Sequence, residues 1–232
     1  MKRFWKQATV AERGSGWGIE LDSRPLRTPA RALLEVPSRA LANAIASEWG
    51  EAANQIDPRA MPLTGLANAA IDRVAPDPTA FAAGLAKYAE GDLLCYRADG
   101  PAPLVEREER RWDPLIAWAR RRFDVDFRIT AGIVHVPQAQ ATVDQLAHAV
   151  EALDAFRLAG LSPLVTIGGS LVAGLAVSEK AVTVDDAWTA VTVDEQWQLD
   201  QWGADAEAEK ALENRRRDFF VAARFLELLS ED

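Results

Sequence analysis

The sequence contains few of the residue types that carry metal or nucleophilic chemistry. Cys95 is the single cysteine and His135 and His148 are the two histidines, and no CxxC or HxxxH spacing brings such ligands together. Gly168-Gly169-Ser170 lacks the second glycine of a GxSxG nucleophile elbow, so these small residues indicate close helix packing. Neither GxxxxGK[ST] nor GxGxxG occurs. We therefore expect no metal, no cofactor and no small-molecule ligand.

Carboxylates are the remaining candidates for catalysis. Asp185 with Asp186, and Asp194 with Glu195, are adjacent acid pairs that could act as general acid and base. A hydrolytic enzyme that uses acidic residues near Asp194 and Asp205 is thus one alternative. Acidic residues are also favoured at helix N-termini, where they complement the helix dipole. We prefer that explanation and expect a protein that is not an enzyme.

Net charge and hydropathy exclude two further classes. A formal net charge of -9 opposes binding to a phosphate backbone, and the arginine clusters are mixed with acids, so we expect no nucleic-acid partner. The most apolar stretch, 161–178, holds three glycines and a proline and falls short of the roughly 20 apolar residues of a membrane span. The N-terminus lacks the apolar core of a signal peptide. These patterns predict a cytoplasmic protein without membrane insertion.

Tryptophan is the unusual feature of the composition. The chain has eight, and Trp188, Trp197 and Trp202 lie within fifteen residues. Tryptophan is enriched both in cores and at the energetic centres of interfaces. On one continuous helix Trp188, Glu195 and Trp202 would share a face. Alternatively, a new helix starts at Thr192, and Glu195 completes a capping box with it.

The elements that must position these residues divide into two groups. Trp17, Ile19 and Leu21 alternate with polar residues or glycine, which predicts a strand that turns at Asp22-Ser23. Ser38 precedes an apolar pattern typical of a helix, and a second helix is expected from about Thr64. We therefore expect a small sheet with a helix that covers it in the N-terminal part.

Pro76-Asp77-Pro78 interrupts the helical pattern and marks the predicted boundary. We expect an α+β protein with an N-terminal α/β domain at 1–76 and a mainly helical domain at 77–232. Capping patterns predict helix starts at Thr142, at Ser162-Pro163 and at Thr183. The segment 123–136 alternates like an extended piece, and the last helix should begin near Ala204.

The segment 193–203 (VDEQWQLDQWG) resembles the C-terminal signature of the chaperone family that assembles the F(1) head of ATP synthases by binding its alpha subunit. Further landmarks that look like those of the family occur in order along the chain. They are RFWK at 3–6, LDSRPLRTPA at 21–30, MPLTGLANAAID at 61–72, DLLCYR at 92–97 and WDP at 112–114.

The resemblance implies a small α/β domain followed by an orthogonal helical bundle. It also implies a chaperone that binds the unassembled alpha subunit and shields its subunit-facing surface until the beta subunit replaces it. Mitochondrial members carry a targeting extension, which we do not expect here. A generic protein-binding scaffold is the other alternative. We place the partner-binding surface on the signature and the residues around it: Trp188, Glu195, Gln198, Trp202, Gly203, Asp205 and Glu207.

Overall fold

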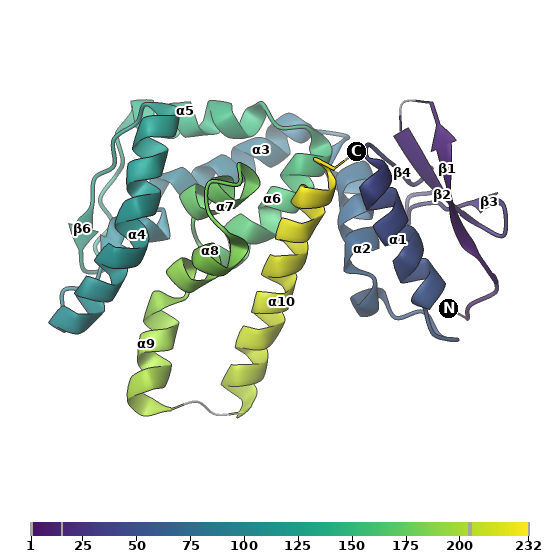
Figure 1. Ribbon diagram of the computed structural model, residues 1–232. Coiled ribbons are helices and arrows are strands. Elements are labelled where there is room, and N and C mark those ends of the chain that lie inside the picture. Colours follow the sequence, from purple (N-terminus) through teal and green to yellow (C-terminus); the bar gives the residue numbers. More distant parts are fainter. Residues whose placement is uncertain (1, 15, 204–205, 232) are drawn as a thin grey trace. The chain divides into compact units, whose positions relative to one another are not determined.

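A computed structural model describes residues 2–14, 16–203 and 206–231 of the chain (Figure 1). The chain forms two compact units. Unit 1 comprises residues 1–78, 154–160 and 224–232, and unit 2 comprises residues 79–153 and 161–223. Residues 154–160 and 224–232, which are distant in sequence from the first 78 residues, thus belong to unit 1. The expected boundary at residues 76 and 77 stays a prediction.

Unit 1 is built on a small antiparallel sheet. Strand β2 (Gly16–Leu21) pairs with β1 (Ala8–Arg13), β3 (Arg24–Pro25) and β4 (Glu35–Val36). It is followed by α1 (Arg39–Glu51), the short 3-10 helix η1 (Pro58–Ala60), α2 (Pro62–Ala69) and the π-helical turn η2 (Ala70–Val74). The predicted strand at Trp17–Leu21, its turn at Asp22-Ser23 and the helix capped by Ser38 are confirmed.

The core of unit 1 lies between this sheet and its helices. Ile19, Leu41 and Ile45 are at most 1% exposed, and Phe225 from near the C-terminus is fully buried with them. Trp5 packs on Trp49 with ring centroids 5.0 Å apart, and its indole nitrogen donates to the Trp49 carbonyl oxygen at 3.0 Å. Burial of these large side chains supplies most of the stability of a unit of this size.

Two of the family-like segments contact each other in unit 1. The backbone N–H of Ala30 donates to Oδ2 of Asp72 at 3.0 Å. Asp72 closes the segment 61–72, and Ala30 closes the segment 21–30. These landmarks therefore include a structural contact that holds the loop before β4 against η2.

Unit 2 is mostly helical and is centred on the long helix α4 (Ala102–Phe123). Trp112, Ile116 and Ala119 on its inner face are at most 1% exposed, and the Trp112 indole donates to the Ala190 carbonyl oxygen at 2.7 Å. The other elements of the unit are α3 (Pro78–Ala86), η3 (Lys87–Glu90), η4 (Leu93–Cys95), β5 (Tyr96–Arg97), β6 (Thr130–Ala131), α5 (Gln140–Glu151), α7 (Leu171–Ser178), α8 (Val184–Val191) and α9 (Val193–Trp202). Two helices, α6 (Ala155–Gly168) and α10 (Ala206–Leu228), have residues in both units.

Asp92 organises the centre of unit 2. Its carboxylate is fully buried and accepts hydrogen bonds from the backbone N–H groups of Leu94 at 3.1 Å and Val172 at 3.0 Å. It therefore joins η4 to the first turn of α7, where Ser170 also caps the helix. Burial raises the pKa of the Asp92 carboxyl, although the backbone donors oppose that shift.

The predicted helix starts had mixed outcomes. Thr183 caps α8 by accepting from the Asp186 N–H, as expected. Thr142 lies inside α5 and donates to the Asp126 carbonyl oxygen, so the predicted start there is wrong. Ser162-Pro163 lies inside α6, because Asp154, eight residues before Ser162, caps that helix by accepting from the N–H groups of Phe156 and Arg157.

The extended piece expected within 123–136 is present as β6, which pairs in parallel with β5. The overall class, a small N-terminal antiparallel sheet followed by a mostly helical region, is the predicted α+β fold. Among the helices of the described residues, none combines the length and the apolar character that a membrane crossing requires.

Candidate binding surface

The helix that carries the predicted partner-binding residues begins at a break. Helix α8 ends at Val191, and Thr192 has φ -114° and ψ 14° before α9 starts at Val193. The Thr192 hydroxyl donates to the Trp188 carbonyl oxygen at 2.8 Å, so it terminates α8 and is not used to cap α9. The continuous helix from Trp188 to Trp202 is therefore wrong. The capping box is also wrong in its hydrogen bonds, although Thr192 does occupy the N-cap position of a new helix.

Glu195 forms an ion pair with Arg215 on α10. Arg215 also donates from Nη2 to the Ile167 carbonyl oxygen at 3.3 Å, so this arginine links α9 to the end of α6. The Glu195 and Arg215 side chains are 42% and 40% exposed. A pair this exposed contributes at most about 1 kcal/mol to stability. Its main effect is to hold Glu195 in place between α9 and α10.

A groove of about 410 Å³ runs between α9 and α10. Glu195, Gln198, Trp202 and Gly203, four of the predicted residues, line it together with Leu212 and small side chains of α10. Trp202 is 77% exposed. A tryptophan side chain this exposed beside a groove is typical of a protein-binding surface, because its burial on binding releases a large apolar area from water.

The other three predicted residues have different positions. Trp188 is buried in the core of unit 2 at 7% exposure, with its ring centroid 5.4 Å from that of Phe219. Glu207 is exposed in the first turn of α10. Asp205 lies outside the described residues. The structure thus brings four of the seven residues to one groove, and their role in binding stays a prediction.

Two buried charged side chains beside α9, Glu108 and Arg97, are not indicated as site residues by the sequence analysis. Glu108 on α4 is 1% exposed, accepts from the Ala98 N–H at 2.9 Å and forms a side-chain hydrogen bond with Asp194. Burial and then the neighbouring Asp194 raise the pKa of Glu108 to about 7. Arg97, 8% exposed, pairs with Asp113 at 2.7 Å and stacks on Trp112. The signal for Glu108 was an acidic residue within the apolar stripe of a helix.

The titratable and nucleophilic groups of unit 2 do not assemble into a catalytic arrangement among the described residues. No cluster of three metal-ligating side chains occurs there. Burial raises the pKa of the Cys95 thiol to about 12, so this thiol is not a nucleophile near neutral pH. The carboxyl pair Glu108–Asp194 has no histidine, serine or cysteine partner among the hydrogen bonds of these residues. The surface is better suited to binding than to catalysis.

Comparison with known proteins finds similar proteins over nearly the whole chain. The family of the ATP12 chaperone protein matches residues 2–120. The mitochondrial protein atp12 of Schizosaccharomyces pombe is 23% identical over 215 residues, covering 88% of this chain and 74% of that protein.

Solved bacterial structures are similar in both sequence and fold. Atp12 from Paracoccus denitrificans is 43% identical with a TM-score of 0.94 and covers 98% of each chain. A mutant of the same organism's Atp12p is 42% identical with a TM-score of 0.94, covering 98% of this chain and 97% of the other. A protein from Agrobacterium tumefaciens is 36% identical with a TM-score of 0.94, covering 99% of this chain and 86% of that one.

The resemblance noted from short sequence segments is thereby confirmed, and so is the expectation that the protein is not an enzyme. The alternatives of a hydrolase and of a scaffold outside any chaperone family are set aside for the same reason. The chain belongs to the ATP12 chaperone family, whose members are non-catalytic assembly factors of the F(1) ATP synthase.

Proposed function

We propose that this chaperone binds the unassembled alpha subunit of F(1) through the groove between α9 and α10. The observation that carries the proposal is Trp202, 77% exposed at the rim of a groove that Glu195 and Gln198 also line. Large exposed aromatic side chains beside polar groups are typical of the energetic centre of an interface. The family to which the chain belongs supplies the client.

The proposed mechanism is reversible shielding. A subunit destined for an alternating ring exposes apolar surface before it meets its neighbours, and such surface drives aggregation. The chaperone covers the beta-facing surface of the alpha subunit and is then displaced by the beta subunit. The sequence has no nucleotide-binding loop, so we expect this cycle to run without ATP hydrolysis by the chaperone.

Cytoplasmic localisation is part of the same proposal. It is supported by the bacterial origin of the solved relatives from Paracoccus denitrificans and Agrobacterium tumefaciens. An F(1) head assembled in that compartment would meet the chaperone directly. Immunofractionation of cells of the source organism tests the localisation.

Trp202→Ala tests the proposed surface. Because Trp202 is mostly exposed, the substitution should change the unfolding free energy by less than about 0.5 kcal/mol. Loss of an interfacial tryptophan typically weakens binding by about 30-fold or more. Phe4→Ala is the matched control, since Phe4 is an aromatic residue 62% exposed in unit 1. Equal affinity of Trp202→Ala and wild-type protein for the alpha subunit contradicts the proposed surface.

Glu195→Gln separates charge from structure at the same groove. Glutamine keeps the shape of the side chain but loses the ion pair with Arg215, which is too exposed to contribute much stability. If the carboxylate contacts a basic site on the alpha subunit, affinity should fall about tenfold while the melting temperature stays within 2 °C. Unchanged affinity excludes Glu195 from the interface. The proposed surface then depends on the result with Trp202→Ala.

A further inference from the structure

A second groove, of about 880 Å³, lies in unit 2 on the face of α9 adjacent to the first. Its walls include Arg97 at the end of β5, the start of α4 with Leu104 and Glu108, the loop after β6, and α9 itself. Gln198 and Trp202 line both grooves. Helix α9 thus presents two neighbouring concave surfaces that share an exposed tryptophan.

One wall of this groove has an acidic pair with a single arginine, Arg97, beside it. Glu108 and Asp194 share a side-chain hydrogen bond, and two carboxylates this close cannot both ionise without a proton or a cation between them. Oδ1 of Asp194 has no hydrogen-bond partner among the described residues. The nearby Arg97 is already engaged by Asp113 at 2.7 Å. The pair is therefore suited to receive a positively charged group.

The same wall also offers unused hydrogen-bond donors. Arg97 is 8% exposed, and its Nε and Nη1 have no hydrogen-bond partner among the residues that the structure describes. A buried guanidinium nitrogen without an acceptor is costly, and a backbone carbonyl of a bound polypeptide would satisfy it. The donors of Arg97 and the acceptors of Asp194 and Glu108 together match a peptide segment with a basic side chain.

Other lining residues of the groove are apolar and project into solvent. Ile133 is 99% exposed and Trp202 is 77% exposed, and both line the groove. Val134, next to Ile133, is 74% exposed. Apolar side chains this exposed along one groove are unusual on a protein that stays alone, and they mark a surface that a partner covers.

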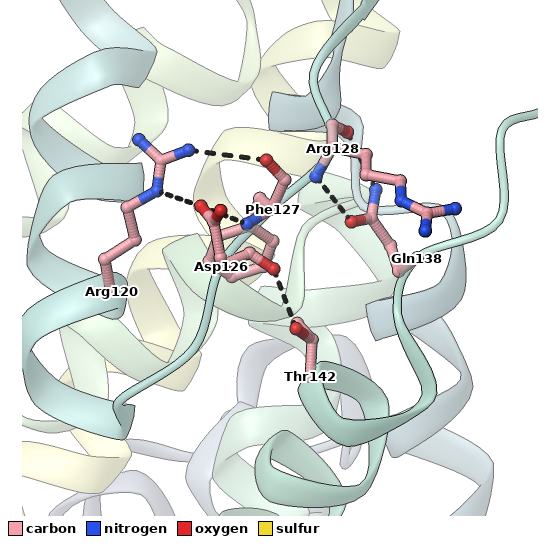
Figure 2. Close-up of polar contacts among 6 residues, drawn as sticks. All are labelled: Arg120, Asp126, Phe127, Arg128, Gln138 and Thr142. Atoms are coloured by element: carbon pink, nitrogen blue, oxygen red, sulfur yellow. Dashed lines mark hydrogen bonds and ion pairs between the residues drawn. The ribbon is translucent and has the colours of Figure 1, made fainter.

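The loop that carries Ile133 is held at its base by polar contacts (Figure 2). Arg120 on α4 pairs with Asp126 at 2.8 Å and donates to the Phe127 carbonyl oxygen at 3.3 Å. The Gln138 amide accepts from the Arg128 N–H and donates to the Arg128 carbonyl oxygen, each at 2.9 Å. Figure 2 shows both ends of the loop fixed in this way.

Two further bonds fix the loop beside the groove. The N–H of Gly132 donates to the Arg97 carbonyl oxygen at 2.8 Å, and the Tyr96 hydroxyl and His135 Nδ1 are 3.0 Å apart in a hydrogen bond. These bonds hold the loop in one conformation with Ile133 exposed. Little conformational entropy of the loop therefore remains to be lost when a partner covers Ile133. An exposed apolar tip on an ordered loop is a preorganised contact.

We propose that this groove binds a segment of the client polypeptide that places a lysine or arginine side chain against Glu108 and Asp194 and an apolar side chain against Ile133. The inference rests on the proposed function, because the client is the unassembled alpha subunit. Charge complementarity selects the occupant: the wall is acidic, and the chain as a whole carries a net charge of -9. A guanidinium would bridge both carboxylates with its forked donors.

Binding of the full alpha subunit to full-length variants, measured by isothermal titration calorimetry at pH 7.5, tests the groove. Glu108→Gln should bind about tenfold more weakly, because the amide cannot pair with a cation. Ile133→Ser should also bind about tenfold more weakly, since the burial of an isoleucine is lost. The matched controls are Glu109→Gln, an exposed acid next to Glu108 on α4, and Leu33→Ser in unit 1; both should bind like the wild type.

The outcomes separate the two proposals. If wild-type protein binds the alpha subunit but Glu108→Gln binds within twofold of it, the groove proposal is overturned and the proposed function stands. If wild-type protein does not bind the alpha subunit, both are overturned. If Glu108→Gln fails to fold, Asp194→Asn is the second variant, and wild-type affinity in that variant overturns the groove proposal.

Discussion

Neutralising Glu108 should stabilise the protein above pH 7. Glu108 has a pKa of about 7 in the folded protein against 4.5 in the unfolded chain, because of burial and the adjacent Asp194. A folded-state pKa above the unfolded value means that the folded state binds the proton more tightly. The contribution of this group to stability is therefore fully present below about pH 4.5 and is lost as the pH rises through about 7.

The magnitude follows from the size of the pKa difference. Each unit corresponds to 1.36 kcal/mol, so the full difference sets a ceiling of roughly 3 kcal/mol. Solvent in the adjoining groove screens the interaction, and about 1 to 2 kcal/mol is the reasonable expectation. Glutamine at position 108 can still accept from the Ala98 N–H and donate to Asp194. Glu108→Gln should thus be more stable than wild type by that amount at pH 8 and nearly equal at pH 4.5.

Urea unfolding followed by tryptophan fluorescence at both pH values measures the difference. Glu109→Gln is the control for loss of a negative charge on α4, and it should differ from wild type by less than about 0.5 kcal/mol at either pH. A stability difference between Glu108→Gln and wild type that is the same at both pH values would refute the reasoning. So would a loss of stability in Glu108→Gln at pH 8.

Three further outcomes are expected. Cys95 is fully buried with a pKa of about 12, so a thiol reagent at pH 8 should label it only after unfolding; fast labelling of the native protein contradicts this. Phe225→Ala should cost unit 1 about 3 to 5 kcal/mol in chemical unfolding, because that ring is fully buried in its core; a cost below about 1 kcal/mol excludes this contribution. Limited proteolysis should cut within 75–79, where the side chains are exposed. The two fragments should co-elute on gel filtration, because residues 154–160 and 224–232 of the second fragment belong to unit 1; separation of the fragments contradicts this.

Much of the fold was readable from the sequence where local signals and burial agree. The alternation at Trp17–Leu21 and the Ser38 cap each predicted an element that the structure contains. Two of the failures share one cause, which is that a threonine with capping chemistry bonds instead to a backbone carbonyl oxygen. Thr142 bonds to Asp126 and Thr192 bonds back to Trp188, and neither choice is visible in local spacing.

The candidate surface was predictable only in part. The run 193–203 indicated α9, and four of its expected residues do line one groove. The burial of Trp188 could not be predicted, because it depends on Phe219, which lies thirty-one positions further along the chain. The acidic pair was missed for the same reason: Glu108 and Asp194 come together only when α4 packs against α9. Long-range packing sets which residues reach the surface.

The central claim, reversible shielding of the alpha subunit, is tested most directly by analytical ultracentrifugation of the chaperone mixed with unassembled alpha subunit in the absence of ATP. The account predicts a one-to-one complex that dissociates when beta subunit is added, with the released chaperone sedimenting as the free protein. The absence of a complex with alpha would contradict the account. A complex with beta of equal strength would contradict it as well, because the chaperone would then not select the subunit it is proposed to shield.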